Sequence, residues 1–480
     1  MINATRRGFL KTASATAATM AISRGLPAWA VAGVSSVRVW GSGGEMRHTP
    51  LAPLVWKAEA GAALEAISLH PESTKQEILG FGGALTDATC YILGQQTANE
   101  RQAILHDFFA PGEMALNVCR TCIGASDYSR NAYSYDDSDT QDTELNKFSI
   151  DHDKAYILPV LRDARKVNPE LFLFSSPWSP PGWMKSSGTM LGGAMRKHSY
   201  EPYAQYFRRF LEAYKAEGVA IDAVTVQNEV DADQDGRMPA CLWGQEYEIE
   251  FVKDHLGPAL RKAGLPTKIW VLDHNYALWG RAVDELSDPD LREYVDGIAW
   301  HGYAGEPAAM SRVHDAFPTK NAYWTEGGPD ITAADYQIDF TRWTETFIGV
   351  LSNWARSITA WNLVLDEKGN PNIGPFPCGG TITVENGTVQ NAAHKVTRSG
   401  QYWALAHFSK HVRRGAKVIA SSQAGKTNGP VSQVAFRNPD ESYVAVLSNS
   451  GAATQVQLVM GAKALTVELP ADSVRTLEWT

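Results

Sequence analysis

The stretch VTVQNEV, from Val224 to Val230, guides the interpretation of the whole chain. Val224, Thr225 and Val226 are β-formers that favour a strand packed on both faces. Glu229 follows only three residues after Val226, yet a glutamate almost never enters a protein core without a partner. We therefore expect a buried strand that carries a carboxylate to a functional site at its end.

Seven further β-rich segments lie on either side of this strand, and several are separated by segments with helical periodicity. The best helix is predicted from Glu201 to Glu217, with Gly218 at the C-cap. Strands that alternate with helices pair in parallel, so eight such units predict an α/β fold of the closed (β/α)8 TIM barrel type, with a doubly wound sheet as the alternative. The expected strands are Ile78–Gly82, Leu116–Arg120, Leu171–Ser176, Ala223–Gln227, Ile269–Asp273, Ile298–His301, Ala322–Thr325 and Ser357–Leu363.

Short β-rich segments separated by turn dipeptides occur at both ends of the chain. Ser36–Trp40 and Ala66–Leu69 precede the strand–helix region, and six more segments follow it, from Lys417 to Trp479. This spacing is typical of an antiparallel sandwich. We predict a catalytic barrel over residues 76–405 and an attached antiparallel β-sandwich domain over residues 406–480, to which residues 31–75 contribute strands.

The first 30 residues have the pattern of an export signal. Arg6-Arg7 is followed by a mildly apolar run, and Ala28-Trp29-Ala30 is a candidate cleavage site, as in twin-arginine signal peptides. No later segment is a continuous apolar run long enough to span a bilayer. We therefore expect an exported protein, periplasmic or extracellular, with no membrane span in the mature chain.

Charge and cysteine content exclude several classes of partner and cofactor. The 480-residue chain has a net charge of −9 and no run of Lys or Arg in its body, so we expect no nucleic-acid partner. Five cysteines are too few for a disulfide framework. Cys119 and Cys122 have metal-ligand spacing but no second ligand pair. We expect ordinary buried cysteines, no metal and no cofactor.

Polar and aromatic residues stand at the ends of seven of the eight expected strands. In a TIM barrel the active site forms where the C-terminal ends of the strands meet, so these side chains are expected to converge. They are Asp87, Arg120, Asp127, Trp178, Asn228, Glu229, His301, Tyr303, Glu326, Trp361 and Asn362.

Two of these residues, Glu229 and Glu326, are carboxylates at the ends of the fourth and seventh strands. Either one alone is more often a salt-bridge partner than a catalyst. Facing each other across a barrel mouth, they form the pair that glycoside hydrolysis uses. Burial and the nearby Arg120 provide a means of separating their pKa values.

Seven ordered motifs resemble glycoside hydrolase family 30, the group that includes lysosomal glucosylceramidase, over about residues 76–415. They are EILGFGGALTDAT, SSPWSPPGWMKSSG, AVTVQNEV, AWHGY, YWTEGG, AWNLVLDEKGNPN and YWALAHFSKHVRRGA. The resemblance implies a barrel with a β-sandwich and a retaining mechanism, with Glu229 as general acid/base and Glu326 as nucleophile, about 5 to 5.5 Å apart. It also implies sugar-binding roles for Asp87, Arg120, Asp127, Trp178, Asn228, His301, Tyr303 and Trp361.

The substrate expected from this resemblance is a carbohydrate or a glycolipid. A β-glucosidase or glucosylceramidase acting in sphingolipid metabolism is the first expectation, and hydrolysis of β-1,6-glucan, a xylan or a fucoside is the alternative within the family. Many relatives carry Pro at the position of Val230, and the loop DADQDGRMPACLWG that follows shapes the aglycone side.

Two alternatives come from other classes. A carbohydrate-binding protein without catalysis has the same fold, but the intact carboxylate pair argues against it. A metal hydrolase using Asp87, Glu229 and His301 lacks any HExxH or multi-histidine motif.

Overall fold

The computed structural model describes residues 36–58, 65–385, 394–424 and 429–480. The predicted signal peptide, residues 1–30, lies outside the described residues. Within them, no helix is both long enough and apolar enough to cross a lipid bilayer.

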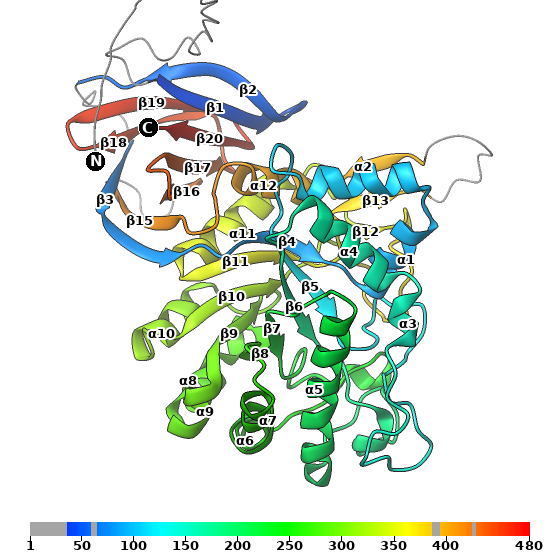
Figure 1. The fold of residues 1–480 in the computed structure, drawn as a ribbon. Coiled ribbons are helices and arrows are strands. Elements are labelled where there is room, and N and C mark those ends of the chain that lie inside the picture. Colours follow the sequence, from blue (N-terminus) through cyan, green and yellow to red (C-terminus); the bar gives the residue numbers. More distant parts are fainter. Residues whose placement is uncertain (1–35, 59–64, 386–393, 425–428) are drawn as a thin grey trace, which may run out of the picture.

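Eight parallel strands close into a barrel in the order β10-β11-β4-β5-β6-β7-β8-β9 (Figure 1), which confirms the predicted TIM barrel. All eight expected strands are present, although their ends differ by a few residues. They are β4 (Gly80–Ala84), β5 (Val118–Cys122), β6 (Phe172–Ser176), β7 (Ala223–Thr225), β8 (Lys268–Asn275), β9 (Val295–His301), β10 (Asn321–Glu326) and β11 (Ala355–Ala360).

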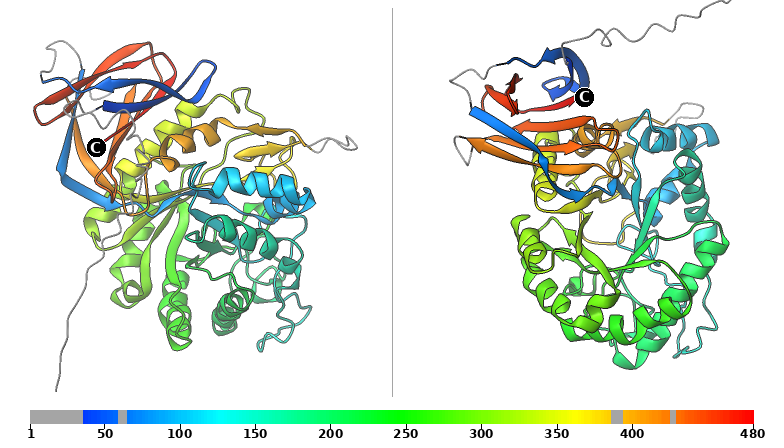
Figure 2. Two further views of the ribbon diagram at one scale, coloured as in Figure 1. Left: turned by 45° about the horizontal axis from the view of Figure 1, so that its top comes forward. Right: turned by 60° about the vertical axis from the view of Figure 1, so that its left-hand side comes forward.

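Helices surround the barrel, as the two views of Figure 2 show. The predicted helix at Glu201–Glu217 is α5. Its C-cap is Glu217, and Gly218 follows directly after the cap with a positive φ of 79°, the conformation that favours glycine there. The helices are α1 (Asp87–Gln95), α2 (Ala98–Phe109), α3 (Asp151–Lys154), α4 (Ile157–Val167), α5 (Tyr200–Ala216), α6 (Gln245–Glu250), α7 (Gly257–Lys262), α8 (Trp279–Ser287), α9 (Pro289–Tyr294), α10 (Ala308–Ala316), α11 (Phe340–Ser352) and α12 (Gly400–Ser409).

Strands from both ends of the chain form one nine-stranded sheet that folds into a sandwich beside the barrel (Figure 1). Its pairing is antiparallel except between β18 and β3. The strand order is β19 (Lys463–Leu469), β18 (Thr454–Met460), β3 (Glu65–Glu77), β15 (Lys417–Ala424), β16 (Val431–Arg437), β17 (Tyr443–Asn449), β20 (Ser473–Trp479), β1 (Ser36–Gly43) and β2 (Met46–Val55). Of these, only β2 was not predicted.

The sandwich packs on the barrel through α11 and α12. Phe408 of α12 contacts Phe347 of α11 and Phe436 of β16, with ring centroids 6.0 Å and 6.5 Å away. Beyond β11, a small sheet of β12 (Val364–Leu365), β13 (Ile382–Val384) and β14 (Val396–Arg398) completes the fold. The buried aromatic contacts hold barrel and sandwich against each other.

Two strand ends differ from the prediction in ways that matter for the site. β7 stops at Thr225 rather than Gln227, so Glu229 lies in the turn after the strand. β8 continues to Asn275, two residues beyond its predicted end. Leu272 and Asp273 both have positive φ, 72° and 43°, and the pairing register with β9 shifts at this point. This bulge changes which side chains of β8 face the barrel interior.

Candidate active site

A cavity of about 450 Å³ opens where the C-terminal ends of the barrel strands meet. Its lining includes both predicted catalytic carboxylates and several aromatic side chains. Seven of the ten predicted site residues line it: Asp127, Trp178, Asn228, Glu229, Tyr303, Glu326 and Trp361. Arg120 and His301 are fully buried and contact these residues from behind.

Glu229 is held by a turn whose backbone is anchored on both neighbouring strands. The amide of Glu229 donates to the carbonyl of Asp273 at 3.0 Å, and the amide of Asn228 donates to that of Pro177 at 2.8 Å. Glu229 itself has a φ of 54°, which a residue with a Cβ adopts at a cost in free energy. The turn is therefore locally strained, and in this conformation the Glu229 carboxylate points into the cavity.

Glu326 is the last residue of β10, and both of its oxygens are engaged. Oε2 accepts from Arg120 Nη1 at 2.5 Å, and Oε1 accepts from the Tyr303 hydroxyl at 3.0 Å. These contacts come from β5 and from the segment after β9. They fix the orientation of the carboxylate, as a nucleophile requires.

Arg120 links the site into one network. Its Nη2 donates to Asn228 Oδ1 at 2.8 Å and to Asp273 Oδ2 at 2.7 Å, and its guanidinium lies 4.6 Å from the ring centroid of Trp178. An arginine remains charged in proteins, so its burial requires partners of opposite charge. Asp273 and Glu326 supply them.

Asp273 is the acceptor at the centre of this network, although the sequence analysis did not select it. Its Oδ2 accepts from Arg120, Ser176 and Thr225, and its Oδ1 accepts from Thr325. Burial opposes the ionisation of this carboxyl, but the Arg120 charge and the hydrogen bonds outweigh burial and hold its pKa well below the usual range. Asp273 is therefore a fixed anion beneath the site.

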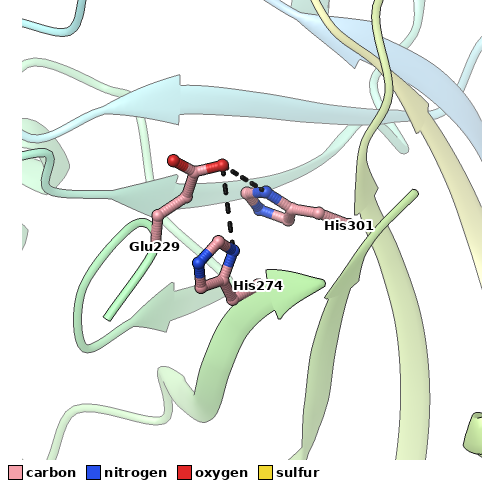
Figure 3. Close-up of side chains that lie close together, drawn as sticks. All are labelled: Glu229, His274 and His301. Carbon is pink, nitrogen blue, oxygen red and sulfur yellow. Dashed lines mark ion pairs between the residues drawn. The ribbon is translucent and has the colours of Figure 1, made fainter. Parts of the chain in front are cut away.

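His301 lies close to both predicted catalytic carboxylates, and Figure 3 shows its contact with Glu229. Its Nδ1 is 3.4 Å from Glu229 Oε1, and its Nε2 is 3.0 Å from Asp273 Oδ1 and 3.8 Å from Glu326 Oε2. Burial lowers the pKa of His301, but the charge of Glu326 and the contacts with Asp273 and Glu229 raise it to about 9.

The contact with His301 lowers the pKa of Glu229. Burial raises the pKa of the Glu229 carboxyl, yet His301, His274 and Gln234 together bring it below its ordinary value. Because the two groups touch, they titrate as a pair rather than singly. Between their two pKa values the pair carries one proton, and the two shifts favour its position on His301.

Two further acidic residues differ from each other in their surroundings. Asp127 lines the cavity, and burial, followed by repulsion from Glu326 and Glu229, raises its pKa well above the ordinary value. Asp87 does not line the cavity. Its Oδ1 accepts from His152 at 2.8 Å and from Tyr156 at 2.6 Å, in a separate cluster. The predicted role of Asp87 in sugar binding stays a prediction.

Sequence reasoning missed the contribution of β8. Asp273, His274 and Asn275 follow the apolar residues of β8 directly, and His274 and Asn275 line the cavity. Their position at a strand end was the signal that was available, but strict alternation along the strand points Leu272, not Asp273, in the same direction as Trp270. The bulge reverses this, so that Asp273 and not Leu272 faces the barrel interior.

Cys378 differs from the prediction that the cysteines are buried. It is only half-buried and lines the cavity.

Comparison with known proteins agrees with this architecture. Residues 78–412 match the family model described as the glycosyl hydrolase family 30 TIM-barrel domain, and residues 415–477 match that of the glycosyl hydrolase family 30 beta sandwich domain. An endo-1,6-beta-D-glucanase of Neurospora crassa is 34% identical over 400 residues, covering 79% of this chain and 80% of that protein. Lysosomal acid glucosylceramidase of Mus musculus is 29% identical over 405 residues, covering 80% and 77%.

Two solved structures extend the likeness to three dimensions. An endo-beta1,6-glucanase superposes with a TM-score of 0.82 at 28% identity, covering 92% of this chain and 99% of that one. SrfJ from Salmonella typhimurium gives a TM-score of 0.86 at 27% identity, with the same coverage.

Proposed function

The chain belongs to glycosyl hydrolase family 30 and is a glycoside hydrolase, and on that premise we propose that it cleaves β-1,6-linked glucan with Glu229 as general acid/base and Glu326 as nucleophile. The observation that carries these roles is that both carboxylates line one cavity, with His301 within 4 Å of each. Arg120 and Tyr303 hold Glu326 of this pair in position.

In the first step Glu326 attacks the anomeric carbon while Glu229 protonates the departing glycosidic oxygen, which leaves a covalent glycosyl-enzyme. Glu229, now a carboxylate, takes a proton from water in the second step, and the water oxygen displaces Glu326. Arg120 and Tyr303 hold Glu326 in one orientation throughout. Their hydrogen bonds leave no need to reorganise the nucleophile during the reaction.

The proton for the first step comes from the Glu229–His301 pair. When it resides on Glu229 Oε1, His301 is neutral, its Nε2–H donates to Asp273 Oδ1, and its unprotonated Nδ1 lies 3.4 Å from Glu229 Oε1. Glu229 then has the proton that the leaving group requires. His301 acts on the substrate only through Glu229 and is a positioning residue.

Asn228 is oriented to donate to the substrate. Its Oδ1 already accepts from Arg120 Nη2 at 2.8 Å, so its amide NH₂ remains for a hydroxyl group of the sugar. A hydrogen bond at the 2-hydroxyl strengthens as charge develops on the ring. This supports the predicted sugar-binding role of Asn228.

The lining of the cavity mouth favours a sugar over a lipid as the aglycone. Four large hydrophobic side chains are well exposed among the described residues. Only two of them, Tyr303 and Phe376, line the cavity, and both are aromatic. Gln234 and Asn275 line the same cavity. Separate, exposed aromatic rings such as Tyr303 and Phe376 suit stacking on pyranose faces, whereas a ceramide needs a continuous exposed apolar surface.

The relatives support the same choice of substrate. Endo-1,6-beta-D-glucanases of two further fungi, Trichoderma harzianum and Aspergillus fumigatus, are 30% and 31% identical to this chain. Glucosylceramide was the first substrate expected from the sequence. The likeness to the murine glucosylceramidase keeps it as the second candidate substrate.

The test compares substrates directly. Purified enzyme is incubated with linear β-1,6-glucan, β-1,3-glucan, xylan and glucosylceramide in detergent micelles, and reducing ends and free glucose are measured. We expect oligosaccharides from the β-1,6-glucan first, with the β-anomer formed initially by NMR, and no product with Glu326→Gln. Faster release of glucose from glucosylceramide than from the glucan contradicts the proposed substrate.

Export rests on the sequence alone. We propose that residues 1–30 direct the folded protein out of the cytoplasm, because the arginine pair, apolar run and cleavage motif stand in the order of a twin-arginine signal. Replacing Arg6 and Arg7 together by lysine is expected to retain the protein in the cytoplasmic fraction. An unchanged distribution contradicts export by this route.

A further inference from the structure

Three side chains at the cavity converge on one point, as Figure 3 shows. Glu229 Oε1 lies 3.4 Å from His301 Nδ1 and 3.8 Å from His274 Nδ1, and all three atoms lie within 4.8 Å of one another. They come from the turn after β7 and from the ends of β8 and β9. Neighbouring barrel strands thus bring together one carboxylate oxygen and two imidazole nitrogens.

The spacing of these atoms matches that of ligands around a tetrahedral ion. With Zn–N and Zn–O distances of about 2.0 to 2.2 Å, two ligand atoms of a tetrahedral site lie about 3.3 to 3.5 Å apart. The Glu229–His301 distance of 3.4 Å falls in this range, and the Glu229–His274 distance of 3.8 Å is slightly longer. The three ligand atoms all lie within 4.8 Å of one another.

The second nitrogen of each histidine is bound to a carboxylate. His301 Nε2 lies 3.0 Å from Asp273 Oδ1, and His274 Nε2 lies 2.5 Å from Asp231 Oδ1. Carboxylate–histidine pairs of this kind hold metal-binding histidines in the tautomer that presents the other nitrogen to the metal. Both histidines therefore present Nδ1 towards Glu229.

Neither Nδ1 has a hydrogen-bond partner among the described residues. His274 is 7% exposed and His301 is fully buried. Buried ring nitrogens in native proteins are usually hydrogen-bonded. Two such nitrogens aimed at the same carboxylate oxygen indicate a ligand that all three atoms share.

We propose that Glu229, His274 and His301 bind one Zn²⁺ ion and that the bound ion inhibits hydrolysis. Two imidazoles and one carboxylate suit Zn²⁺, and also Cu²⁺, whereas Mg²⁺ and Ca²⁺ prefer sets of oxygen ligands. The inhibition rests on the proposed role of Glu229: an ion on Oε1 displaces the proton that the leaving group needs. The ion is thus an inhibitor and not a cofactor.

The fourth ligand position faces the cavity, because Glu229 and His274 both line it. A substrate that fills the cavity and a bound Zn²⁺ ion therefore compete for the same space. We expect inhibition to weaken as the concentration of substrate rises, and we expect a strong chelator to restore the full rate.

A second group of histidines lies where the barrel meets the sandwich and requires a control. His48 Nε2 and His411 Nε2 are 2.9 Å apart, close to His407, so any Zn²⁺ bound by these histidines has to be separated from Zn²⁺ bound at the cavity. A His48→Ala variant breaks up this group without touching the cavity.

The experiment measures binding directly and does not depend on a known substrate. Chelator-treated enzyme in the His48→Ala background is titrated with ZnCl₂ by calorimetry, with and without the additional substitution His274→Ala. We expect one high-affinity equivalent in the first protein and none in the second. Absence of that equivalent in the first protein, or its persistence after His274→Ala, overturns the site.

Asp231→Asn provides a milder variant, because Asp231 is half-exposed and makes no direct contact with the proposed ion. Loss of such a supporting carboxylate weakens metal affinity by about 10- to 100-fold. We expect a shift of this size in the Zn²⁺ dissociation constant, while His70→Ala on the sandwich leaves it unchanged. An unchanged dissociation constant in Asp231→Asn contradicts the proposed orientation of His274.

Inhibition is measured separately, relative to the metal-free rate of each variant. We expect Zn²⁺ to inhibit the His48→Ala protein at concentrations at least tenfold lower than those needed for His274→Ala, with no effect of Mg²⁺. Tight binding without inhibition overturns the inhibitory role while leaving the binding site in place. If no tested glycoside is hydrolysed, the proposed function fails, and the calorimetric result still decides the site.

Discussion

Two layers of side chains inside the barrel come from the same strands but have opposite character. The lower layer is apolar and includes Val118, Phe174, Trp270 and Tyr323, with the Trp270 and Tyr323 rings stacked at 3.9 Å. The upper layer, two residues further along most strands, is polar and is connected through Asp273. Alternation of side chains along a strand places both layers in the interior.

The difference shows how one set of strands serves two purposes. The lower layer contributes the burial of large aromatic surfaces, which stabilises the barrel. The upper layer keeps Arg120, Asp273 and His301 buried, a costly arrangement unless every charge has a partner. We therefore expect substitutions in the lower layer to change stability and substitutions at the cavity to change the rate.

The largest effect is expected for Glu326→Gln at the cavity. Removal of the nucleophile should lower kcat by on the order of 10⁵-fold, while the variant still folds, because Asp273 keeps the buried Arg120 paired. The rate is measured on the best glucan substrate, and circular dichroism follows unfolding. A variant that keeps more than a tenth of the activity rules out Glu326 as the nucleophile.

The next effect is expected for Glu229→Gln and depends on the leaving group. Loss of the general acid should cost about 10²- to 10⁴-fold on a glucan, but far less on an aryl β-glucoside whose phenolate leaves without a proton. The ratio of the two rate losses is the diagnostic measurement. Equal losses on both substrates indicate a structural role for Glu229.

In the lower layer, Trp270→Ala should cost about 3 to 5 kcal/mol of unfolding free energy, because Trp270 is fully buried. The folded fraction should retain nearly normal kcat. Thr325→Val is the matched change in the upper layer, since it removes a donor to Asp273 with little change in volume. If Trp270→Ala lowers kcat more than Thr325→Val does, the two layers are not functionally separate.

The smallest effect expected is a pH dependence set by the Glu229–His301 pair. The raised pKa of His301, about 9, means that the pair loses its last proton as the pH rises through this value. We expect kcat/KM to fall above about pH 9, and His301→Gln to move this fall to lower pH. A fall at the same pH in the variant assigns the ionisation to another group.

The raised pKa of His301 also predicts how the free energy of unfolding changes with pH. Because the folded pKa of His301 is raised from 6.5 to about 9, its contribution to stability is complete below pH 6.5 and is lost as the pH rises through about 9. Thermal unfolding across this window should show a larger decrease in the wild type than in His301→Gln. Parallel curves contradict the raised pKa.

The order of the strands and the position of most site residues were predictable from the sequence. Glu229 and Glu326 follow runs of β-formers, and once eight strands close into a barrel their C-terminal ends meet in one place. Trp178, Tyr303 and Trp361 reach the cavity for the same reason.

The remaining assignments were beyond a reading of the chain. Asp273 faces the interior because a bulge inserts one residue into the alternation of β8, and no local pattern marks that bulge. Asp87 is hydrogen-bonded to His152 and Tyr156, which lie 65 and 69 positions away in the sequence. Contacts of this kind form only when distant segments pack together.

The sequence by itself thus determined the barrel, the sandwich built from both ends of the chain, and the meeting of Glu229 with Glu326, because hydrophobic periodicity and strand topology are written locally. Only the tertiary structure decided which groups surround each carboxylate, and with them the pKa values and the convergence of His274 and His301 on Glu229. Those properties depend on distances of 3 to 4 Å between side chains from different strands, and such distances are set by packing and by small departures from regular strand geometry.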